Sequence, residues 1–296
     1  MIIVYNFCRV RGLEISAWEF DVTNGQCEPK TSSNGSRYEL SGPADAPVLA
    51  LIHGLGLNRR IWDRYRSRLG QRYRVLTYDL YGHGESAAPP HTPDLTLFSE
   101  QLVGLMDELA LEQCALVGFS LGGMINRRLA LDHPERVTAL AILNSPHERG
   151  GEAQSRAEKQ AMDAAAGGPG ATLEAAIERW FTPAFRNSHN DYIEQVRGWV
   201  LANDPDIYAQ CRQVLAFGVV ELIRPEPPIT HPTLVITCEY DSGSTPAMSQ
   251  AIASEIAGAG VIIVPDLRHM GLAENPSFFI TALSEFLEAV PLSATG

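Results

Sequence analysis

A serine between two glycines is the strongest candidate for a reactive side chain in this sequence. Ser120 lies in the pattern Gly118-x-Ser120-x-Gly122, directly after the apolar run 115–117, and the residues 121–132 fit a helix. An apolar run of this kind is typical of a strand that is covered on both faces. A serine on a sharp strand-to-helix turn exposes its hydroxyl, and small neighbours prevent clashes between the strand and the helix. We therefore predict that Ser120 is a nucleophile.

An acid and a histidine follow later strands, in the order that nucleophilic catalysis on such a sheet requires. Asp241 comes shortly after the apolar run 233–237, and His269 follows the run 261–264. The carboxyl ends of parallel strands share one edge of a sheet, so both side chains can converge with Ser120. His269 would take the proton of the serine during attack on a carbonyl carbon, and Asp241 would hold the imidazole in the required tautomer. Water activated by the histidine would then cleave the acyl-enzyme.

Other residues compete for the roles of acid and base. Glu239 and Asp266 are alternative acids. Glu239 points to the opposite side of its strand from Asp241 if the extended backbone continues, and Asp266 is close in sequence to the histidine. His53 and His83 lie in glycine-rich turns, where a histidine more often bonds to nearby backbone. We favour Asp241 as the acid and interpret both turn histidines as structural.

Two backbone amides are candidates for holding the oxygen that becomes negative during acyl transfer. The turn 53–56, His-Gly-Leu-Gly, follows the buried strand 48–52 and can aim the N–H of Leu55 at the mouth of the sheet. The N–H of Leu121, the residue after the nucleophile, is the second donor. The helix that begins there adds its dipole. We predict that Leu55 and Leu121 form an oxyanion hole.

The elements that must position these residues alternate between strand and helix from 48 to 264. This alternation predicts an α/β fold with a mainly parallel central sheet and helices on both faces. The alternation stops between 148 and 228, where charged helical stretches and aromatic residues predict a helical insertion over the sheet. The predicted divisions are an N-terminal strand and loop extension (1–36), the first part of the core (37–146), a helical cap (147–228), the second part of the core (229–290) and a tail (291–296).

The composition indicates an ordinary globular protein, and the partner we expect is a small-molecule substrate. The 296 residues are 45% hydrophobic and carry a net charge of -12, which would repel nucleic-acid phosphates. No apolar run reaches the length of a membrane span, and the start of the chain lacks the basic residues of a signal peptide. The cysteines show no metal-ligand spacing and suit a reducing compartment. We expect a cytoplasmic protein without metal or organic cofactor; the sequence predicts no particular oligomeric state.

Together these motifs resemble the landmarks of the α/β-hydrolase superfamily. The resemblance rests on the segments 53–56, 79–86, 118–123, 241–246 and 269–271, and it spans roughly residues 37 to 290. It implies the α/β-hydrolase fold and a serine-dependent hydrolase that cleaves an ester or lactone. Within the predicted cap, the stretch 179–185 and the sequence Tyr-Ala-Gln-Cys at 208–211 are similar to 3-oxoadipate enol-lactonases, which hydrolyse an enol lactone in aromatic catabolism.

Substrate contacts are expected from the cap. The candidates are Trp180, Phe181, Phe185, Trp199 and Arg179. If the substrate is a carboxylated lactone, it would need a cap arginine, and the available ones are Arg149, Arg179, Arg186 and Arg212. Two other functions stay open. The same residues serve a carbon–carbon bond hydrolase that acts on a ring-cleavage product, and a ligand-binding receptor could keep this fold without turnover.

Overall fold

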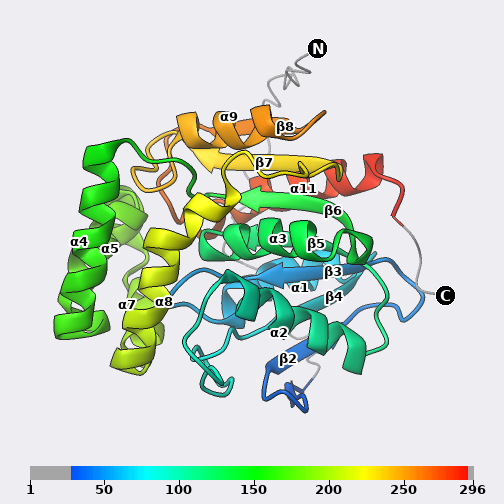
Figure 1. Cartoon of the computed structure of the whole chain (residues 1–296), viewed down its shortest axis with the longest axis horizontal. Helices are drawn as coiled ribbons and strands as arrows, with labels where there is room; N and C mark the ends of the chain where they lie inside the picture. The colour runs from blue at the N-terminus through cyan, green and yellow to red at the C-terminus, as the bar shows by residue number, and fades with distance from the viewer. Residues whose placement is uncertain (1–27, 293–296) are drawn as a thin grey trace.

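The computed structural model describes residues 28–292, and within them eight strands form a single sheet (Figure 1). Its order is β1-β2-β4-β3-β5-β6-β7-β8. The strands are β1 (Lys30–Thr31), β2 (Arg37–Ser41), β3 (Val48–Ile52), β4 (Arg74–Tyr78), β5 (Cys114–Phe119), β6 (Val137–Leu143), β7 (Thr233–Cys238) and β8 (Gly260–Val264). Only the pairs β1–β2 and β2–β4 are antiparallel. The predicted α/β class with a mainly parallel sheet is confirmed. Most of the predicted N-terminal extension (1–36) lies outside the described residues.

Helices cover both faces of the sheet and explain why its central strands are continuously apolar. Every residue of β3, β5 and β7 is buried. Helices α2 and α3 pack together, and α1 and α11 form a second pair that lies behind the sheet in Figure 1. The helices of this part are α1 (Asp63–Leu69), α2 (Leu95–Glu108), α3 (Leu121–Asp132), α9 (Pro246–Glu255), α10 (Gly271–Glu274) and α11 (Pro276–Ala289).

A group of helices between β6 and β7 stands together at the left of Figure 1; we call it the insertion. It comprises α4 (Gly151–Gly167), α5 (Leu173–Trp180), α6 (Pro183–Ser188), α7 (Asn190–Leu201) and α8 (Pro205–Phe217), with the 3-10 turns η3 (Pro169–Thr172) and η4 (Gly218–Leu222). Side-chain caps begin two of its helices. Thr182 accepts a hydrogen bond from the amide of Phe185, and Asp204 accepts from the amide of Ile207.

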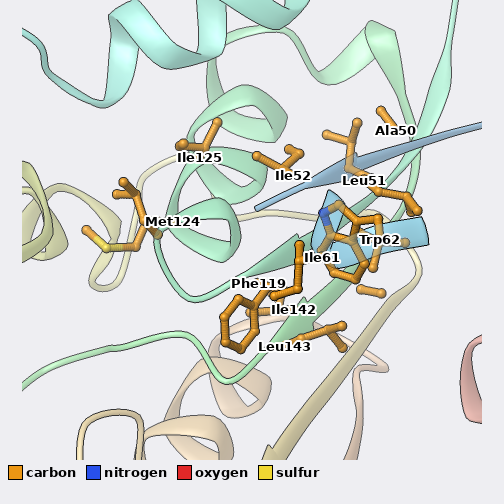
Figure 2. Packing of buried hydrophobic residues seen from close by; sticks show 14 of the residues in the cluster. Ala50, Leu51, Ile52, Ile61, Trp62, Phe119, Met124, Ile125, Ile142 and Leu143 are labelled. Carbon is orange, nitrogen blue, oxygen red and sulfur yellow. The ribbon is translucent and has the colours of Figure 1, made fainter. Parts of the chain in front are cut away.

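Figure 2 shows one part of the hydrophobic core, where side chains of the central strands, of α3 and of the turn η1 (Arg59–Trp62) pack together. Trp62, Phe119 and Met124 are at most 1% exposed there, and Figure 2 shows them packed among aliphatic side chains of β3 and β6. Burial of each such side chain contributes about 1.5–3 kcal/mol. This packing fixes the carboxyl end of β5, which is the end that carries Ser120.

The two turn histidines are buried in the fold. His53 Nε2 accepts a hydrogen bond from the amide of Leu80 at 3.0 Å, and its Nδ1 lies 2.8 Å from the carbonyl oxygen of Gly54. His83 Nδ1 lies 3.1 Å from the carbonyl oxygen of Tyr81. Burial lowers the pKa of His53 to about 4 and that of His83 to about 3. Both imidazoles are therefore neutral at pH 7, and their contacts are those of structural residues.

These histidines predict a loss of stability at mildly acidic pH. Between pH 6.5 and about 4 an unfolded chain protonates His53, whereas the folded chain keeps it neutral. The unfolded state then binds more protons, so the stability rises with pH in this window and is lost as the pH falls through it. For His53 the loss is about 3 kcal/mol over the whole window, of which about 2 kcal/mol falls between pH 7.5 and pH 5. Urea denaturation at pH 7.5 and pH 5 measures it. His83→Asn should flatten the slope, while substitution of the exposed His91 should leave it unchanged; equal slopes in both variants would contradict the prediction.

Candidate active site

Ser120 occupies a strained turn between β5 and α3. Its φ and ψ angles are +55° and -113°, a conformation that L-residues rarely adopt. The turn is possible because its neighbours lack side chains. A Cβ on Gly118 would lie 2.2 Å from the carbonyl oxygen of Gly122, and a Cβ on Gly122 would lie 2.2 Å from that of Ile52. The amide of Ser120 donates to the carbonyl of Leu143 at 2.9 Å, which ties the turn to β6.

Asp241 and His269 are joined by a short hydrogen bond. The distance from His269 Nδ1 to Asp241 Oδ2 is 2.7 Å. The other carboxylate oxygen, Oδ1, accepts from the amides of Gly243 and Ser244, each at 2.9 Å. Asp241 is only 2% exposed. Burial acts to raise its pKa, but the charge of His269 and the donated hydrogen bonds outweigh burial and bring the pKa below its ordinary value. The carboxylate is therefore ionised and can orient the imidazole.

One cavity brings these residues together. Its volume is about 350 Å³, and Ser120, Asp241 and His269 all line it. The rings of Phe119 and Trp180 lie beside the imidazole of His269, with centroid distances of 5.0 and 6.3 Å. Helices of the insertion supply much of the remaining wall, so a bound molecule would be held between the sheet edge and the insertion.

The sequence profile of the alpha/beta hydrolase family matches residues 49–282. The chain belongs to this family. It is 28% identical over 252 residues to the 3-oxoadipate enol-lactonase 2 of Acinetobacter baylyi, covering 85% of this chain and 92% of that protein. It is 26% identical to the (E)-2-((N-methylformamido)methylene)succinate hydrolase of the same organism, covering 88% and 97%. The crystal structure of the enol-lactonase from Burkholderia xenovorans is 29% identical, with a TM-score of 0.78 over 86% of this chain and 98% of that one. The predicted membership and the likeness to enol-lactonases are confirmed.

In this alpha/beta hydrolase, Asn144 is a site residue that sequence reasoning missed. It follows β6 with a φ of +46°, is fully buried, and donates from Nδ2 to Asp241 Oδ2 at 2.9 Å. Asp241 Oδ2 thus accepts from both Asn144 and His269. The sequence feature that could have identified Asn144 is its position just after the apolar run 137–143, which places it at the same sheet edge as Ser120.

The rival acids lie away from the imidazole. Glu239 accepts a hydrogen bond from the amide of Asp266 at 3.1 Å, and both side chains are exposed. Among the carboxylates of residues 28–292, the one within 4 Å of a His269 nitrogen is that of Asp241. The geometry therefore favours Asp241 over both alternatives.

The two amides predicted for the oxyanion hole are available. Leu55 lines the cavity, and Leu121 is the first residue of α3, where a helix leaves its N–H groups without internal partners. Within the described part of the chain, neither N–H donates to a protein acceptor. The insertion holds the turn that carries Leu55, because Asn203 Nδ2 donates to the carbonyl of Gly56 at 3.1 Å.

Three of the predicted substrate contacts, Phe181, Phe185 and Trp199, are not among the residues that line the cavity. Phe181 has no exposed surface and stacks on Phe185, with ring centroids 5.5 Å apart. Trp199 packs edge-on against Tyr192. These rings form the insertion's own packing. Of the five predicted contacts, Arg179 and Trp180 line the cavity.

Some of the arginines proposed from the sequence line the cavity and one does not. Arg149, Arg179 and Arg212 line the cavity, as does Arg156, which the sequence reasoning did not consider. Arg186 is not among the lining residues. Four arginines thus line the cavity.

A cluster of hydrogen bonds fastens the insertion to the loop that carries His269. The amide of Met270 donates to the carbonyl of Trp180 at 2.8 Å. Glu274 accepts from both the amide and the hydroxyl of Thr182, at 2.8 and 2.5 Å. Arg268 donates to the carbonyl of Phe181 at 3.3 Å. The histidine loop and residues 180–182 therefore form one unit.

No helix within residues 28–292 is both long and apolar enough to cross a bilayer. The same part of the chain contains no group of three or more His, Cys, Asp or Glu side chains placed to hold a metal ion.

Proposed function

We propose that this alpha/beta hydrolase cleaves a carboxylic ester or lactone of a small molecule through an acyl-enzyme on Ser120. The observation that carries the proposal is the 2.7 Å bond between Asp241 and His269 at the cavity that also contains Ser120 on its strained turn. A nucleophile, a base and a group that orients the base are the parts that covalent acyl transfer requires.

The reaction proceeds in two stages. His269 Nε2 takes the hydroxyl proton of Ser120 as the oxygen attacks the carbonyl carbon, while Asp241 keeps Nδ1 protonated and stabilises the imidazolium. The amides of Leu55 and Leu121 receive the negative oxygen, and removal of one such donor typically costs about 10²–10³ in kcat. The imidazolium then protonates the leaving alcohol. In the second stage water, deprotonated by the same histidine, cleaves the acyl-enzyme and regenerates the serine.

An enol lactone is the first substrate to test. Two of the similar proteins are named as enol-lactonases, one of them specifically for 3-oxoadipate enol-lactone. A cavity of about 350 Å³ suits a substrate of this small size. Such an activity would place the protein in aromatic catabolism. A cytoplasmic location belongs to the same proposal, and the buried free thiols of Cys114, Cys211 and Cys238 support a reducing compartment.

A panel of substrates tests the proposal. Wild-type protein is assayed with p-nitrophenyl acetate and butyrate, simple γ- and δ-lactones and 3-oxoadipate enol-lactone, and is separately treated with a fluorophosphonate. Hydrolysis together with one phosphonate on Ser120, located by mass spectrometry, supports the proposal. Cleavage of a vinylogous diketone without ester or lactone turnover would replace it by carbon–carbon bond hydrolysis. Binding of a ligand without any turnover would replace it by a receptor function.

Asn144 is expected to affect how the activity depends on pH. Asn144→Gly removes the donor to Asp241 Oδ2 and adds no backbone strain, because glycine accepts the φ of +46°. Asp241 Oδ2 then accepts from His269 alone of these two donors, so the Asp241 carboxylate interacts more strongly with the imidazolium. We expect kcat/KM to fall about tenfold, the order of one lost charged hydrogen bond, and the acid limb of its pH profile to move to higher pH. The companion variant Asn144→Asp, which also tolerates this φ, places a second carboxyl beside Asp241. Because two carboxyls this close share a proton, the new carboxyl can donate to Asp241 Oδ2 in place of the amide, and the limb should move less than in Asn144→Gly. A limb that stays in place in Asn144→Gly would assign Asn144 a packing role alone.

A further inference from the structure

We propose that Trp180, at the end of α5, is a positioning residue for the base His269, because its indole ring helps to hold the plane of the imidazole. The insertion then takes part in catalysis as well as covering the cavity. This inference rests on the proposed hydrolysis at Ser120 and deepens it. It adds no chemical step and gives Trp180 a role besides contact with the substrate.

The base needs more than the one hydrogen bond that holds it to the acid. His269 Nδ1 lies 2.7 Å from Asp241 Oδ2. A single hydrogen bond fixes that nitrogen but leaves the ring free to tilt, and Nε2 on the opposite edge moves with the tilt. Because the proton of Ser120 is transferred to Nε2, a tilted ring lowers the fraction of molecules that are aligned for reaction.

Two aromatic rings lie beside this imidazole. The ring centroid of Phe119 is 5.0 Å from that of His269, with an interplanar angle of 42°, and the centroid of Trp180 is 6.3 Å away, with an angle of 33°. In residues 28–292 no ring contact joins Phe119 to Trp180, so the two rings reach the imidazole from different directions. Only 12% of the His269 side chain is exposed. The rings therefore limit the directions in which the imidazole can tilt.

The core fixes the ring of Phe119. Phe119 is the last residue of β5, directly before Ser120, and is 1% exposed. A Cβ on Gly54 would lie 3.1 Å from the Phe119 ring and 3.1 Å from the Cβ of Ser120, so these groups are tightly packed. Phe119 is thus a rigid wall beside the base, and the second wall depends on Trp180.

The backbone around Trp180 is fixed by the two chain neighbours of His269. The amide of Met270 donates to the carbonyl of Trp180 at 2.8 Å. Arg268 donates from Nη1 to the carbonyl of Phe181 at 3.3 Å and also to the carbonyl of Glu178. The end of α5 is therefore held at a set position relative to the base, and the ring of Trp180 is held with it.

Trp180 also lines the cavity, where it is half-buried, so contact with the substrate is the alternative role. The two roles affect different kinetic constants. A contact that binds substrate and transition state equally changes KM, whereas alignment of the base acts only in the chemical step and changes kcat.

Replacement of the ring tests the proposal. Trp180→Leu keeps an apolar wall but removes the aromatic plane. With p-nitrophenyl acetate we expect kcat to fall about three- to tenfold, the factor of one aromatic pair, while KM stays the same. The rate at which a fluorophosphonate modifies Ser120 should fall by the same factor, because this reaction needs the same base. Trp180→Phe, which restores a ring, should recover part of both rates.

Trp199→Leu is the matched control. It removes the other tryptophan of the insertion, which packs edge-on against Tyr192 and is not among the residues that line the cavity. We expect kcat and the phosphonate reaction to stay unchanged, with circular dichroism and thermal melting showing that every variant is folded. A higher KM with unchanged kcat in Trp180→Leu would leave only contact with the substrate and overturn the inference. An equal fall of kcat in Trp199→Leu would show that any loosening of the insertion suffices, and would overturn it too.

A spectroscopic measurement separates this inference from the proposed function. The imidazole proton that His269 shares with Asp241 is observed by proton NMR as a downfield resonance while it is protected from exchange with water, and it is assigned by its loss in His269→Gln. We expect it in wild type and Trp199→Leu, and expect it to broaden in Trp180→Leu. This result supports the inference even if no ester is cleaved, in which case only the proposed function fails. A resonance that is the same in Trp180→Leu and in wild type would overturn the inference, and turnover that depends on Ser120 would then leave the proposed function intact.

Discussion

Replacement of Ser120 by alanine is expected to lower kcat for ester or lactone hydrolysis by about 10⁴- to 10⁶-fold, as for the nucleophile of other serine hydrolases. Without the hydroxyl, no acyl-enzyme forms, and His269 has no proton to take from residue 120. The oxyanion amides remain, because they belong to the backbone, and they account for the residual rate. Single-turnover and steady-state assays of the purified variant measure the loss.

Ser242→Ala is the matched control for this experiment. Ser242 lines the same cavity but lies on the loop after β7 rather than on the strained turn. The control should retain nearly all of the activity, and circular dichroism with thermal melting should show that both variants are folded. Retention of more than about one tenth of wild-type kcat by Ser120→Ala would contradict nucleophilic catalysis by this serine.

The second large effect is expected at Asp241. Asp241→Asn keeps the size of the side chain but removes the charge and permits the wrong imidazole tautomer, which in serine hydrolases costs about 10⁴ in kcat. The measurement is kcat between pH 6 and 9. Glu239→Gln is the control, since Glu239 lies on the same loop and accepts a hydrogen bond from the amide of Asp266 rather than from His269. A small loss at Asp241 together with a large one at Glu239 would move the role of the acid to Glu239.

The fold and the convergence of the three reactive residues could be predicted because they depend on local pattern and simple topology. Apolar runs locate the strands, and parallel strands end at one edge, so residues that follow different strands meet there. The strained turn at Ser120 could also be predicted from local sequence, because it requires the glycines on either side. A Cβ on Gly118 would lie 2.2 Å from a backbone oxygen, so the turn needs glycine at that position.

The substrate side of the cavity could not be predicted in the same way. Aromatic residues of the insertion can face either the cavity or their own helices, and the choice depends on how short helices pack. Phe181 and Phe185 stack on each other, whereas Trp180, the residue before Phe181, lies beside the ring of His269. The hydrogen bond from Asn144 to Asp241 joins residues that are 97 positions apart, and no local sequence pattern at either position predicts this pairing.

The attachment of residues 180–182 to the histidine loop limits the routes by which molecules enter and leave. Met270, Arg268 and Glu274 hold that corner of the insertion through backbone and side-chain hydrogen bonds. If that corner lifted, it would pull on the loop that carries the base. A substrate or product that passes without disturbing the base would therefore cross another part of the cavity rim, and the imidazole would stay aligned while it does so.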